Sequence, residues 1–207
     1  MPNERLEQTI SNYFDSNIQK LYKQKVIVID GNFEKENLGL STNSYLELAN
    51  CVSTVIHCGA NVRHYRKYSL FYNANVVGTQ NMIQFCKDAN CPIAHISTLS
   101  VGGFSQCNTR NCLDETLLNV EQEFKNQVYM ITKYQAEYEI LKAISSNEIL
   151  GKVFRLGNIM PRLKDGLFQN NIHDNAFISR LHTIKSIKCL PATYQEMIID
   201  ISPVDLC

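Results

Sequence analysis

Four short apolar runs alternate along this chain with longer segments of helical patterning, and this alternation constrains the fold more than any other feature. The runs cover residues 26–29, 54–57, 92–96 and 152–156. Short runs of this kind are typical of strands that are buried on both faces of a sheet. Their alternation with helices predicts an α/β fold built on a doubly wound parallel sheet with right-handed crossovers.

The longer segments carry apolar residues at the spacing of one helical face. The first predicted helix covers residues 5–21. A second helix of about ten residues begins at an N-cap formed by Ser41 or Thr42 and turns Leu46 and Ala49 inward. The other predicted helices cover residues 68–89, 128–145 and 176–187, and a last strand and turn cover residues 198–205.

Composition sets the broad class of protein. The 207 residues, 44% of them hydrophobic and 19% charged, are enough for one sizeable core of a soluble globular domain. Twenty basic and twenty acidic side chains give a formal net charge of zero, so no overall field attracts nucleic acid or an anionic membrane. Because residues 1–10 lack an apolar targeting segment and no apolar run reaches the ~20 residues of a membrane span, we expect a cytoplasmic protein.

The cysteines and histidines form no recognisable metal-binding pattern. Cys107 and Cys112 flank a polar loop, but no companion His/Cys pair accompanies them. His57 and His64 lack a third ligand nearby. We therefore expect no metal site, and free thiols that are mostly buried. The eight cysteines are Cys51, Cys58, Cys86, Cys91, Cys107, Cys112, Cys189 and Cys207.

A tyrosine and a lysine stand four residues apart in the predicted helix over residues 128–145. Tyr129 and Lys133 therefore share one helical face, and a neighbouring ammonium would lower the phenol pKa from its usual value of roughly 10. That would make Tyr129 a candidate proton donor. Tyr138 and Lys142 repeat the spacing, but nine residues place them roughly 180° around the axis and about 13 Å along it, so one pocket cannot hold both pairs.

Small and polar side chains follow two of the predicted strands. Gly59 and Ala60, after the strand over residues 54–57, would let a ligand approach the backbone closely. Ser97 and Thr98 gather hydroxyls at the end of the next strand, where they could polarise a carbonyl oxygen or cap a turn.

Five segments in a fixed order carry a resemblance to a known family. Together they resemble the extended short-chain dehydrogenase/reductase family, most closely the thioester reductase domains that end nonribosomal peptide synthetases and carboxylic acid reductases. The resemblance runs from about residue 5 to residue 207. The segments are residues 57–60 (His-Cys-Gly-Ala), 75–79 (Asn-Val-Val-Gly-Thr), 96–101 (Ile-Ser-Thr-Leu-Ser-Val), 128–133 (Val-Tyr-Met-Ile-Thr-Lys) and 155–158 (Arg-Leu-Gly-Asn).

The resemblance implies roles for individual residues. Thr98, Tyr129 and Lys133 match the catalytic residues of the family. Asn32 stands where relatives have an aspartate that contacts adenine, although a turn-forming asparagine is an equal alternative. Asn75 either ties its helix to a strand or supports the active site. The cofactor-binding positions implied are Asn32, Gly59, Ala60, Asn75, Lys133 and Asn158.

The resemblance also implies a Rossmann-like sheet that is incomplete. Relatives begin with a strand, a glycine-rich turn, a helix and a second strand, whereas the first glycine here is Gly31. The run over residues 26–29 would be the third strand of the order 3-2-1-4-5-6. We expect a partial NAD(P)-binding domain over residues 1–160 and a partial substrate-binding region over residues 161–207. Without the glycine-rich turn, we expect these 207 residues alone neither to bind NADPH tightly nor to reduce a substrate.

The activity implied is NADP(H)-dependent reduction of an acyl or peptidyl thioester, carried on the phosphopantetheine arm of a carrier domain, to an aldehyde. A second reduction to the alcohol and the use of NAD in place of NADP stay open. The alternatives are a nucleotide-sugar epimerase or dehydratase, a fatty acyl-CoA reductase of the same fold, and a non-catalytic remnant that docks a partner domain.

Overall fold

The computed structural model describes residues 2–63, 67–104, 113–172, 175–190, 192 and 200–207. The chain divides into two compact units, Met1–Asn32 and Phe33–Cys207, and each is described by itself. Within the described part of the chain, no helix is both long and apolar enough to span a membrane.

The first unit is a pair of helices, α1 (Pro2–Tyr13) and α2 (Ser16–Lys25). The sequence predicts one helix over this region, and that prediction is wrong because Asp15 caps a new helix. Its carboxylate accepts hydrogen bonds from the backbone nitrogens of Asn17 at 2.9 Å and Ile18 at 3.1 Å. Neither helix contains a buried residue.

The apolar run over residues 26–29 does not form the predicted strand. The structure assigns no regular element there, and Ile27 is 87% exposed. A β-branched run becomes a strand only when a neighbouring strand satisfies its backbone groups, and no described strand pairs with this one.

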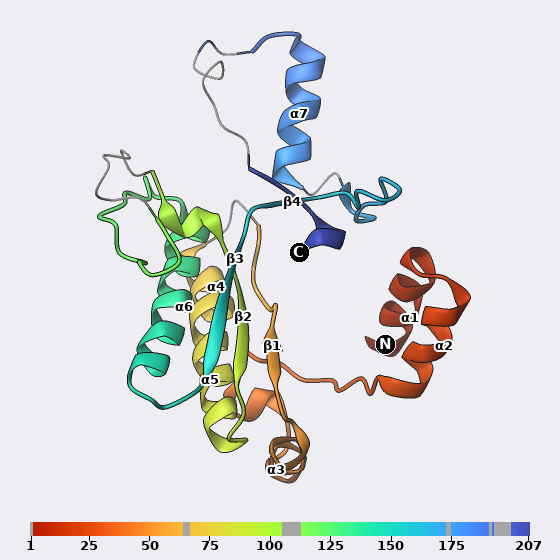
Figure 1. Ribbon diagram of the computed structural model, residues 1–207, viewed down its shortest axis with the longest axis vertical. Helices are drawn as coiled ribbons and strands as arrows, with labels where there is room; N and C mark the ends of the chain where they lie inside the picture. Colours follow the sequence, from red (N-terminus) through yellow and green to blue (C-terminus); the bar gives the residue numbers. More distant parts are fainter. Residues whose placement is uncertain (1, 64–66, 105–112, 173–174, 191, 193–199) are drawn as a thin grey trace. The chain divides into compact units, whose positions relative to one another are not determined.

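The second unit is built on a three-stranded parallel sheet in the order β1-β2-β3, which confirms the predicted α/β class (Figure 1). The register aligns His57 with His95, and His95 with Val153. Each connection between neighbouring strands contains a helix, as parallel strands require. The strands are β1 (Val55–His57), β2 (Ile93–Thr98) and β3 (Gly151–Leu156), one fewer than the four expected.

Helix α3 (Thr42–Cys51) begins at the predicted N-cap, where the Ser41 hydroxyl accepts a hydrogen bond from the backbone nitrogen of Ser44 at 3.2 Å. Its inward face is formed by Tyr45 and Ala49, which lie one turn apart and are both buried. Leu46, expected to face inward, is 52% exposed. The prediction was therefore right for Ala49 and wrong for Leu46, whose place on the inward face is taken by Tyr45. A short 3₁₀ turn, η1 (Glu36–Gly39), precedes this helix.

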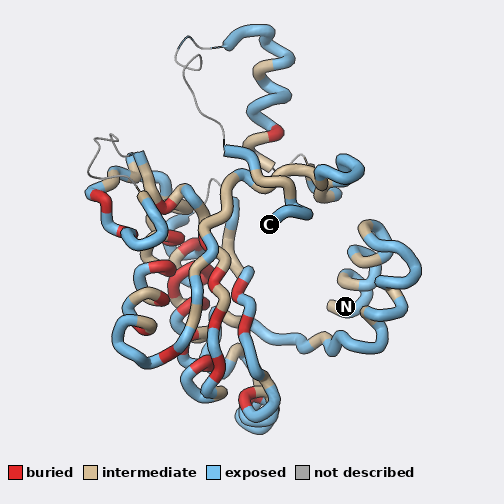
Figure 2. The backbone as a smooth tube through the Cα atoms, in the orientation of Figure 1, coloured by how far each residue is buried: buried red, intermediate tan, exposed pale blue. Residues whose placement is uncertain are grey.

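The long helical segment after β1 passes from α-helix to π-helix and back to α-helix, and a second long helix follows β2. Their packing against the sheet encloses the buried core (Figure 2). The largest fully buried side chains include Phe71, Phe85 and Ile140. The elements are α4 (Tyr68–Phe71), the π-helix η2 (Tyr72–Val77), α5 (Gly78–Asp88), the 3₁₀ turn η3 (Leu99–Gly102) and α6 (Val128–Ser145).

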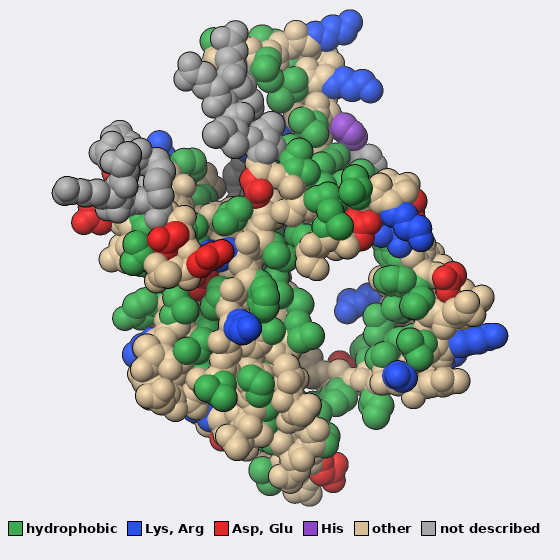
Figure 3. Space-filling model, in the orientation of Figure 1, with side chains coloured by type: hydrophobic (Ala, Val, Ile, Leu, Met, Phe, Trp, Pro, Cys, Tyr) green, Lys and Arg blue, Asp and Glu red, His purple; other side chains and the backbone are tan. Residues whose placement is uncertain are grey.

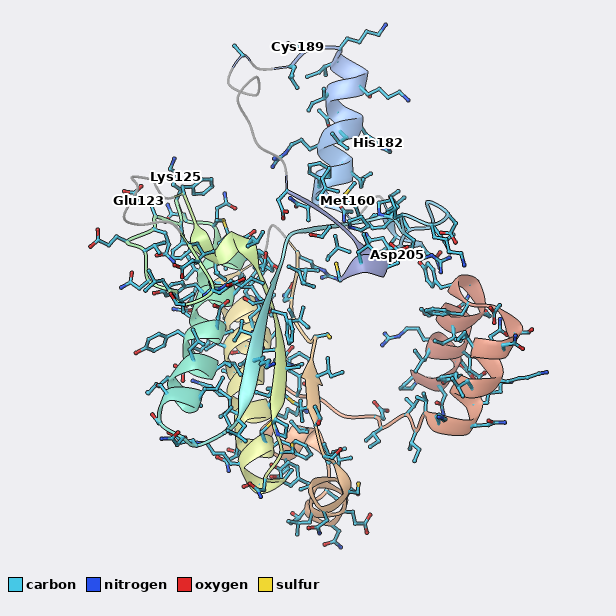
Figure 4. All side chains as sticks on the ribbon, viewed as in Figure 1. Glu123, Lys125, Met160, His182, Cys189 and Asp205 are labelled. Atoms are coloured by element: carbon cyan, nitrogen blue, oxygen red, sulfur yellow. The ribbon has the colours of Figure 1, made fainter. Side chains whose placement is uncertain are left out.

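The remaining elements form a smaller region. The carboxylate of Asp205 (Figure 4) accepts hydrogen bonds from the backbone nitrogens of Leu163 at 2.8 Å and Lys164 at 3.2 Å. The predicted domain boundary after residue 160 stays a prediction. The strands β4 and β5, which lie on either side of that boundary, pair in parallel. Residues 193–199 lie outside the described part of the chain. The elements are β4 (Asn158–Met160), α7 (Ala176–Ile187), β5 (Ile201–Pro203) and η6 (Val204–Leu206).

Candidate active site

The start of α6 and the end of β2 bring three of the predicted site residues together. Tyr129 lies in the first turn of α6 and Lys133 one turn later. The Lys133 ammonium is buried and donates a hydrogen bond to the carbonyl oxygen of Ile96 at 2.9 Å. The side chains of Tyr129 and Thr98 share a hydrogen bond. Thr98, Tyr129 and Lys133 therefore form one cluster at the carboxyl end of β2, the edge at which open α/β sheets bind ligands.

Ser97 and Thr98 make different contacts, as neighbours on a strand do. The Ser97 hydroxyl is buried and donates to the carboxylate of Glu137. Thr98 fulfils one of its two expected roles, the turn cap, and its role toward a carbonyl oxygen stays a prediction. Its Oγ1 accepts a hydrogen bond from the backbone nitrogen of Ser100 at 3.1 Å, which caps η3, while its side chain also meets Tyr129.

The pKa of Tyr129 shifts in the direction opposite to the one that the sequence predicts. Burial raises the pKa, and the hydrogen bond with Thr98 opposes this only in part. The Lys133 ammonium, expected to lower this pKa, is bonded to the Ile96 carbonyl instead. Tyr129 therefore stays a neutral phenol at neutral pH, which is the form that donates a hydrogen bond.

Lys133 is buried, and its pKa is lower than that of an ordinary lysine. Burial lowers its pKa to about 8, although the nearby Glu137 and Cys58 side chains act in the opposite direction. Two buried histidines lie in the same region, with ring centroids 5.2 Å apart. Burial lowers the pKa of His57 to about 4 and that of His95 to about 2, and Lys133 lowers both further. Both imidazoles are therefore neutral at neutral pH.

The two histidines differ in their hydrogen bonds. Nε2 of His57 lies 3.1 Å from the hydroxyl of Thr79. Neither ring nitrogen of His95 has a hydrogen-bond partner among the described residues. Sequence reasoning treated His57 as a strand-end residue and did not single out His95, since nothing in the local sequence shows that the two rings meet across the sheet.

Glu137 is the site residue that sequence reasoning missed. It is fully buried, and its Oε2 accepts a hydrogen bond from Ser97 at 2.5 Å. Its Oε1 lies 2.7 Å from both Nε and Nη2 of Arg155 in β3. The available signal was spacing, because Glu137 lies four residues after Lys133 and eight after Tyr129, on the same helical face.

The loop that leads into α6 packs against η3. The Gln122 side chain donates to the carbonyl of Val101 at 2.8 Å, and the Phe104 backbone nitrogen donates to the carbonyl of Glu123 at 2.8 Å. The Lys125 ammonium lies 4.9 Å from the centroid of the Phe104 ring (Figure 4). These contacts place a non-helical segment beside the Thr98 end of the sheet.

Asn75 holds two parts of the site together. It lies in the π-helix η2, a form of helix that is frequent at functional sites. Its Nδ2 donates to Oγ1 of Thr132 at 2.9 Å, and its Oδ1 accepts from the backbone nitrogen of Asn61 at 2.7 Å. The side chain thus ties the segment after β1 to α6. Its part in cofactor binding stays a prediction.

The space above Gly59 is filled by an aromatic ring. A Cβ at Gly59 would lie 3.0 Å from the ring of Phe33, which also packs edge-on against His57 with centroids 5.8 Å apart. The space that the missing side chain of Gly59 leaves is therefore occupied by the Phe33 ring of the protein itself. Ala60 beside it is partly exposed, and cofactor roles for Gly59 and Ala60 stay predictions.

The two remaining predicted cofactor residues lie outside β2 and α6, the elements that carry Thr98, Tyr129 and Lys133. Asn158 is exposed at the start of β4, where its Nδ2 donates to the carbonyl of Asp200 at 3.0 Å. Asn32 is the last residue of the first unit. Their roles also stay predictions.

The expectation of mostly buried thiols is wrong for the cysteines that the structure describes. Cys86 and Cys91 are buried, whereas Cys51, Cys58, Cys189 and Cys207 are exposed. Among the described residues, no three His, Cys, Asp or Glu side chains gather as metal ligands would. Cys107, Cys112 and His64 lie outside the described part of the chain.

The cluster fits one end of a nicotinamide dinucleotide. Among the described residues, the one hydrogen-bond acceptor of the Lys133 ammonium is the Ile96 carbonyl, so N–H donors remain for ribose hydroxyls. Tyr129 and Thr98 place hydroxyls beside it. No glycine-rich strand-turn-helix precedes Gly31 to hold a pyrophosphate.

A parallel α/β sheet with a Thr-Tyr-Lys cluster at its carboxyl edge defines the class of NAD(P)-dependent oxidoreductases known as extended short-chain dehydrogenases/reductases. Residues 1–207 match the NAD-binding family described as male sterility protein, so the chain belongs to this family. The family binds NAD(P)H, which agrees with the cofactor that the sequence predicts.

Individual relatives agree with this assignment. Aldehyde reductase lnbA of Aspergillus flavus is 27% identical over 193 residues, covering 89% of this chain and 18% of the relative. A thiolation-reductase di-domain from an archaeal nonribosomal peptide synthetase is 29% identical with a TM-score of 0.83, covering 99% of this chain and 54% of that structure. The terminal R domain of the myxalamid pathway shares the fold at 20% identity and a TM-score of 0.79, over 99% and 49% of the two chains. The chain thus spans about a fifth of that curated relative and about half of these structures.

Proposed function

We propose that this chain forms the catalytic part of an NADPH-dependent reductase that converts an acyl or peptidyl thioester, bound to a carrier domain, into an aldehyde. The observation that carries the proposal is the hydrogen bond between Thr98 and Tyr129, with the buried Lys133 one helical turn away. Two hydroxyls and an ammonium in this arrangement suit a carbonyl group that gains negative charge.

The relatives support the choice of substrate class. One of them is named as an aldehyde reductase, and another joins a thiolation domain to a reductase domain in a peptide synthetase. A thiolation domain carries its acyl group as a thioester. We therefore infer a carrier domain as partner and a phosphopantetheine thioester as substrate.

The chain's own residues would bind and polarise the thioester carbonyl. Tyr129, held as a neutral phenol by burial, donates a hydrogen bond to the carbonyl oxygen and then gives up its proton. Thr98 supplies a second hydroxyl to the same oxygen. The hydrogen bond from the backbone nitrogen of Ser100 fixes the position of its Oγ1. Lys133 stabilises the phenolate that forms and holds the ribose hydroxyls. NADPH, when bound, supplies the hydride.

The products follow from the balance of the reaction. Addition of a hydride to the carbonyl carbon and a proton to its oxygen gives a hemithioacetal. Cleavage of the C–S bond then releases the thiol of the phosphopantetheine arm and the aldehyde. The aldehyde is two electrons more reduced than the thioester, which matches one equivalent of NADPH.

The test is a product assay with the intact protein, NADPH and an acyl thioester on a phosphopantetheine-bearing carrier domain. We expect one aldehyde for each NADPH oxidised, measured by mass spectrometry and by absorbance. An acyl-CoA and a nucleotide sugar serve as rival substrates. Turnover of the nucleotide sugar without aldehyde formation from either thioester would overturn the proposal.

A further inference from the structure

The strongest unassigned feature is Glu137, a carboxylate that is fully buried in the middle of α6. A buried carboxylate is costly unless donors surround it. Glu137 receives three hydrogen bonds or ionic contacts, one from Ser97 in β2 and two from the guanidinium of Arg155 in β3. The sequence therefore maintains a charge on the catalytic helix at a position where an apolar residue would pack without this cost.

Arg155 extends the network to the loop before α6. Its Nη2 donates to the carbonyl of Leu117 at 3.0 Å, and its Nη1 donates to the carbonyl of Asp114. The loop is also anchored by Leu118 and Val120, which are both buried. One guanidinium thus joins β3, the loop and the carboxylate of Glu137.

The same carboxylate acts on Lys133, one turn earlier on the helix. Burial lowers the pKa of Lys133 to about 8, and the negative charge of Glu137 is the largest influence that opposes this. Cys58 acts in the same direction as Glu137 but less strongly, and His57 and His95 add no negative charge. The titratable or charged groups that act on Lys133 or Glu137 are Cys58, His57 and His95 on the sheet side, Arg155 from β3, and Tyr134 from α6.

We propose that Glu137, fixed by Arg155, is a positioning residue that keeps the Lys133 ammonium charged and directed at the Tyr129 end of the site. For its effect on catalysis, the inference rests on the proposed thioester reductase. Its effect on the charge of Lys133 does not depend on any substrate. The two claims can therefore fail separately.

A purely structural role makes a different prediction. Glu137→Gln keeps the shape of the side chain and an oxygen that can accept from Arg155, but it removes the charge. If Glu137 served packing alone, this variant would change stability and leave the titration of Lys133 where it was. The matched control is Glu139→Gln, the same change two residues further along α6 and on another face of the helix.

The decisive experiment follows the Cε signal of Lys133 by ¹³C-lysine NMR during a pH titration of the full chain, with the signal assigned from Lys133→Met. We expect a midpoint near 8 in the wild type and in Glu139→Gln. In Glu137→Gln the midpoint should fall by about one unit, the usual effect of one close opposite charge. An unchanged midpoint in Glu137→Gln would overturn the proposal.

A second variant covers the case in which Glu137→Gln leaves Arg155 without a partner and fails to fold. The double change Glu137→Gln with Arg155→Met removes both buried charges, a replacement that proteins often tolerate. Because loss of the Arg155 charge acts in the opposite direction, the midpoint of Lys133 should fall by less than in Glu137→Gln, and a midpoint above the wild-type value would contradict the proposal. Glu137→Asp keeps the negative charge, so the midpoint of the Lys133 titration in this variant should stay close to the wild-type value.

Enzyme assays add a readout of catalysis. In Glu137→Gln the high-pH limb of kcat/KM should move down by about one unit, which is about a tenfold loss above the new midpoint, while KM for the thioester changes little. A shifted Lys133 midpoint with an unchanged pH profile would refute the positioning role. Absence of thioester reduction in the wild type would instead count against the proposed function alone.

Discussion

Helix α6 carries the tyrosine–lysine spacing twice, and the two pairs meet different surroundings. Lys133 is 4% exposed and bonded to the sheet, and Tyr129 meets Thr98. Tyr138, by contrast, is 52% exposed, and Lys142 lies on the outer surface of the helix. The comparison shows that spacing puts two side chains on one helical face, while burial and contacts with another element distinguish one such face from the other.

The two faces of the sheet differ in a similar way. The face toward α5 and α6 buries His57, His95 and Ser97, each with a polar or charged neighbour. On the other face, Ile56 is 70% exposed and Phe154 is 44% exposed, and hydrophobic side chains gather over the strands (Figure 3). The buried polar groups thus lie on the side of the sheet that carries the candidate site.

The largest effect should separate the two lysines. We expect Lys133→Met to reduce turnover of an acyl thioester by roughly 1,000-fold, because it removes both the charge that stabilises the Tyr129 phenolate and the donor for the ribose. Lys142→Met should change turnover by less than about twofold, as surface changes usually do. Steady-state assays of NADPH consumption in the intact protein measure both. Similar losses in the two variants would show that burial does not distinguish these lysines.

Thr98 offers a smaller and sharper comparison. Thr98→Val removes the hydroxyl that meets Tyr129 and should lower kcat by roughly 10-fold to 100-fold, the scale of a lost oxyanion donor. Thr98→Ser keeps the hydroxyl and should retain most of the activity. A fully active Thr98→Val would exclude a role for this hydroxyl. Ser97→Ala is a poor control, since Ser97 is a donor to the buried Glu137.

The smallest effect concerns stability at acid pH. The pKa of His57 is lowered to about 4 and that of His95 to about 2, from an unfolded value of about 6.5. Below pH ~6.5 the unfolded chain binds protons that the folded chain does not, so stability should be complete above that pH and fall as the pH decreases. Lys133, protonated in both states over this range, contributes nothing to the change.

Thermal unfolding between neutral pH and about pH 5 measures this effect, with an expected decrease in Tm of roughly 2–4 °C for each kcal/mol lost. His95→Phe removes the more deeply shifted group and should make the decrease smaller. His182→Gln, a change at an exposed histidine of α7, should leave it as it was. An equal decrease in His95→Phe and the wild type would mean that His95 is not the group responsible.

Much of the fold follows from local pattern. The predicted helices over residues 128–145 and 176–187 match α6 and α7 in both bounds, because the spacing of apolar residues is encoded locally. The strand over residues 26–29 failed for a reason outside its own sequence, since a strand needs a partner. Asp15 was a local signal that could have been read, and the helix over residues 5–21 was predicted without it.

The candidate site was predictable only in part. Thr98, Tyr129 and Lys133 could be chosen from ordered motifs, and the structure brings them together. For Glu137 the sequence offers only its spacing on the Tyr129 and Lys133 face, because its partners Ser97 and Arg155 lie 40 and 18 residues away in sequence. The predicted direction of the Tyr129 pKa shift was wrong for a similar reason, because burial depends on how the whole chain packs.

The most direct test of the central claim compares the two tyrosines of α6. Tyr129→Phe and Tyr138→Phe each remove one hydroxyl from the same helix, the first beside Thr98 and the second at a surface position. We predict that Tyr129→Phe lowers kcat for aldehyde formation by at least ~100-fold, the scale of a lost general acid, and that Tyr138→Phe stays close to the wild type. Equal activity of the two variants in the NADPH-coupled thioester assay would contradict the account.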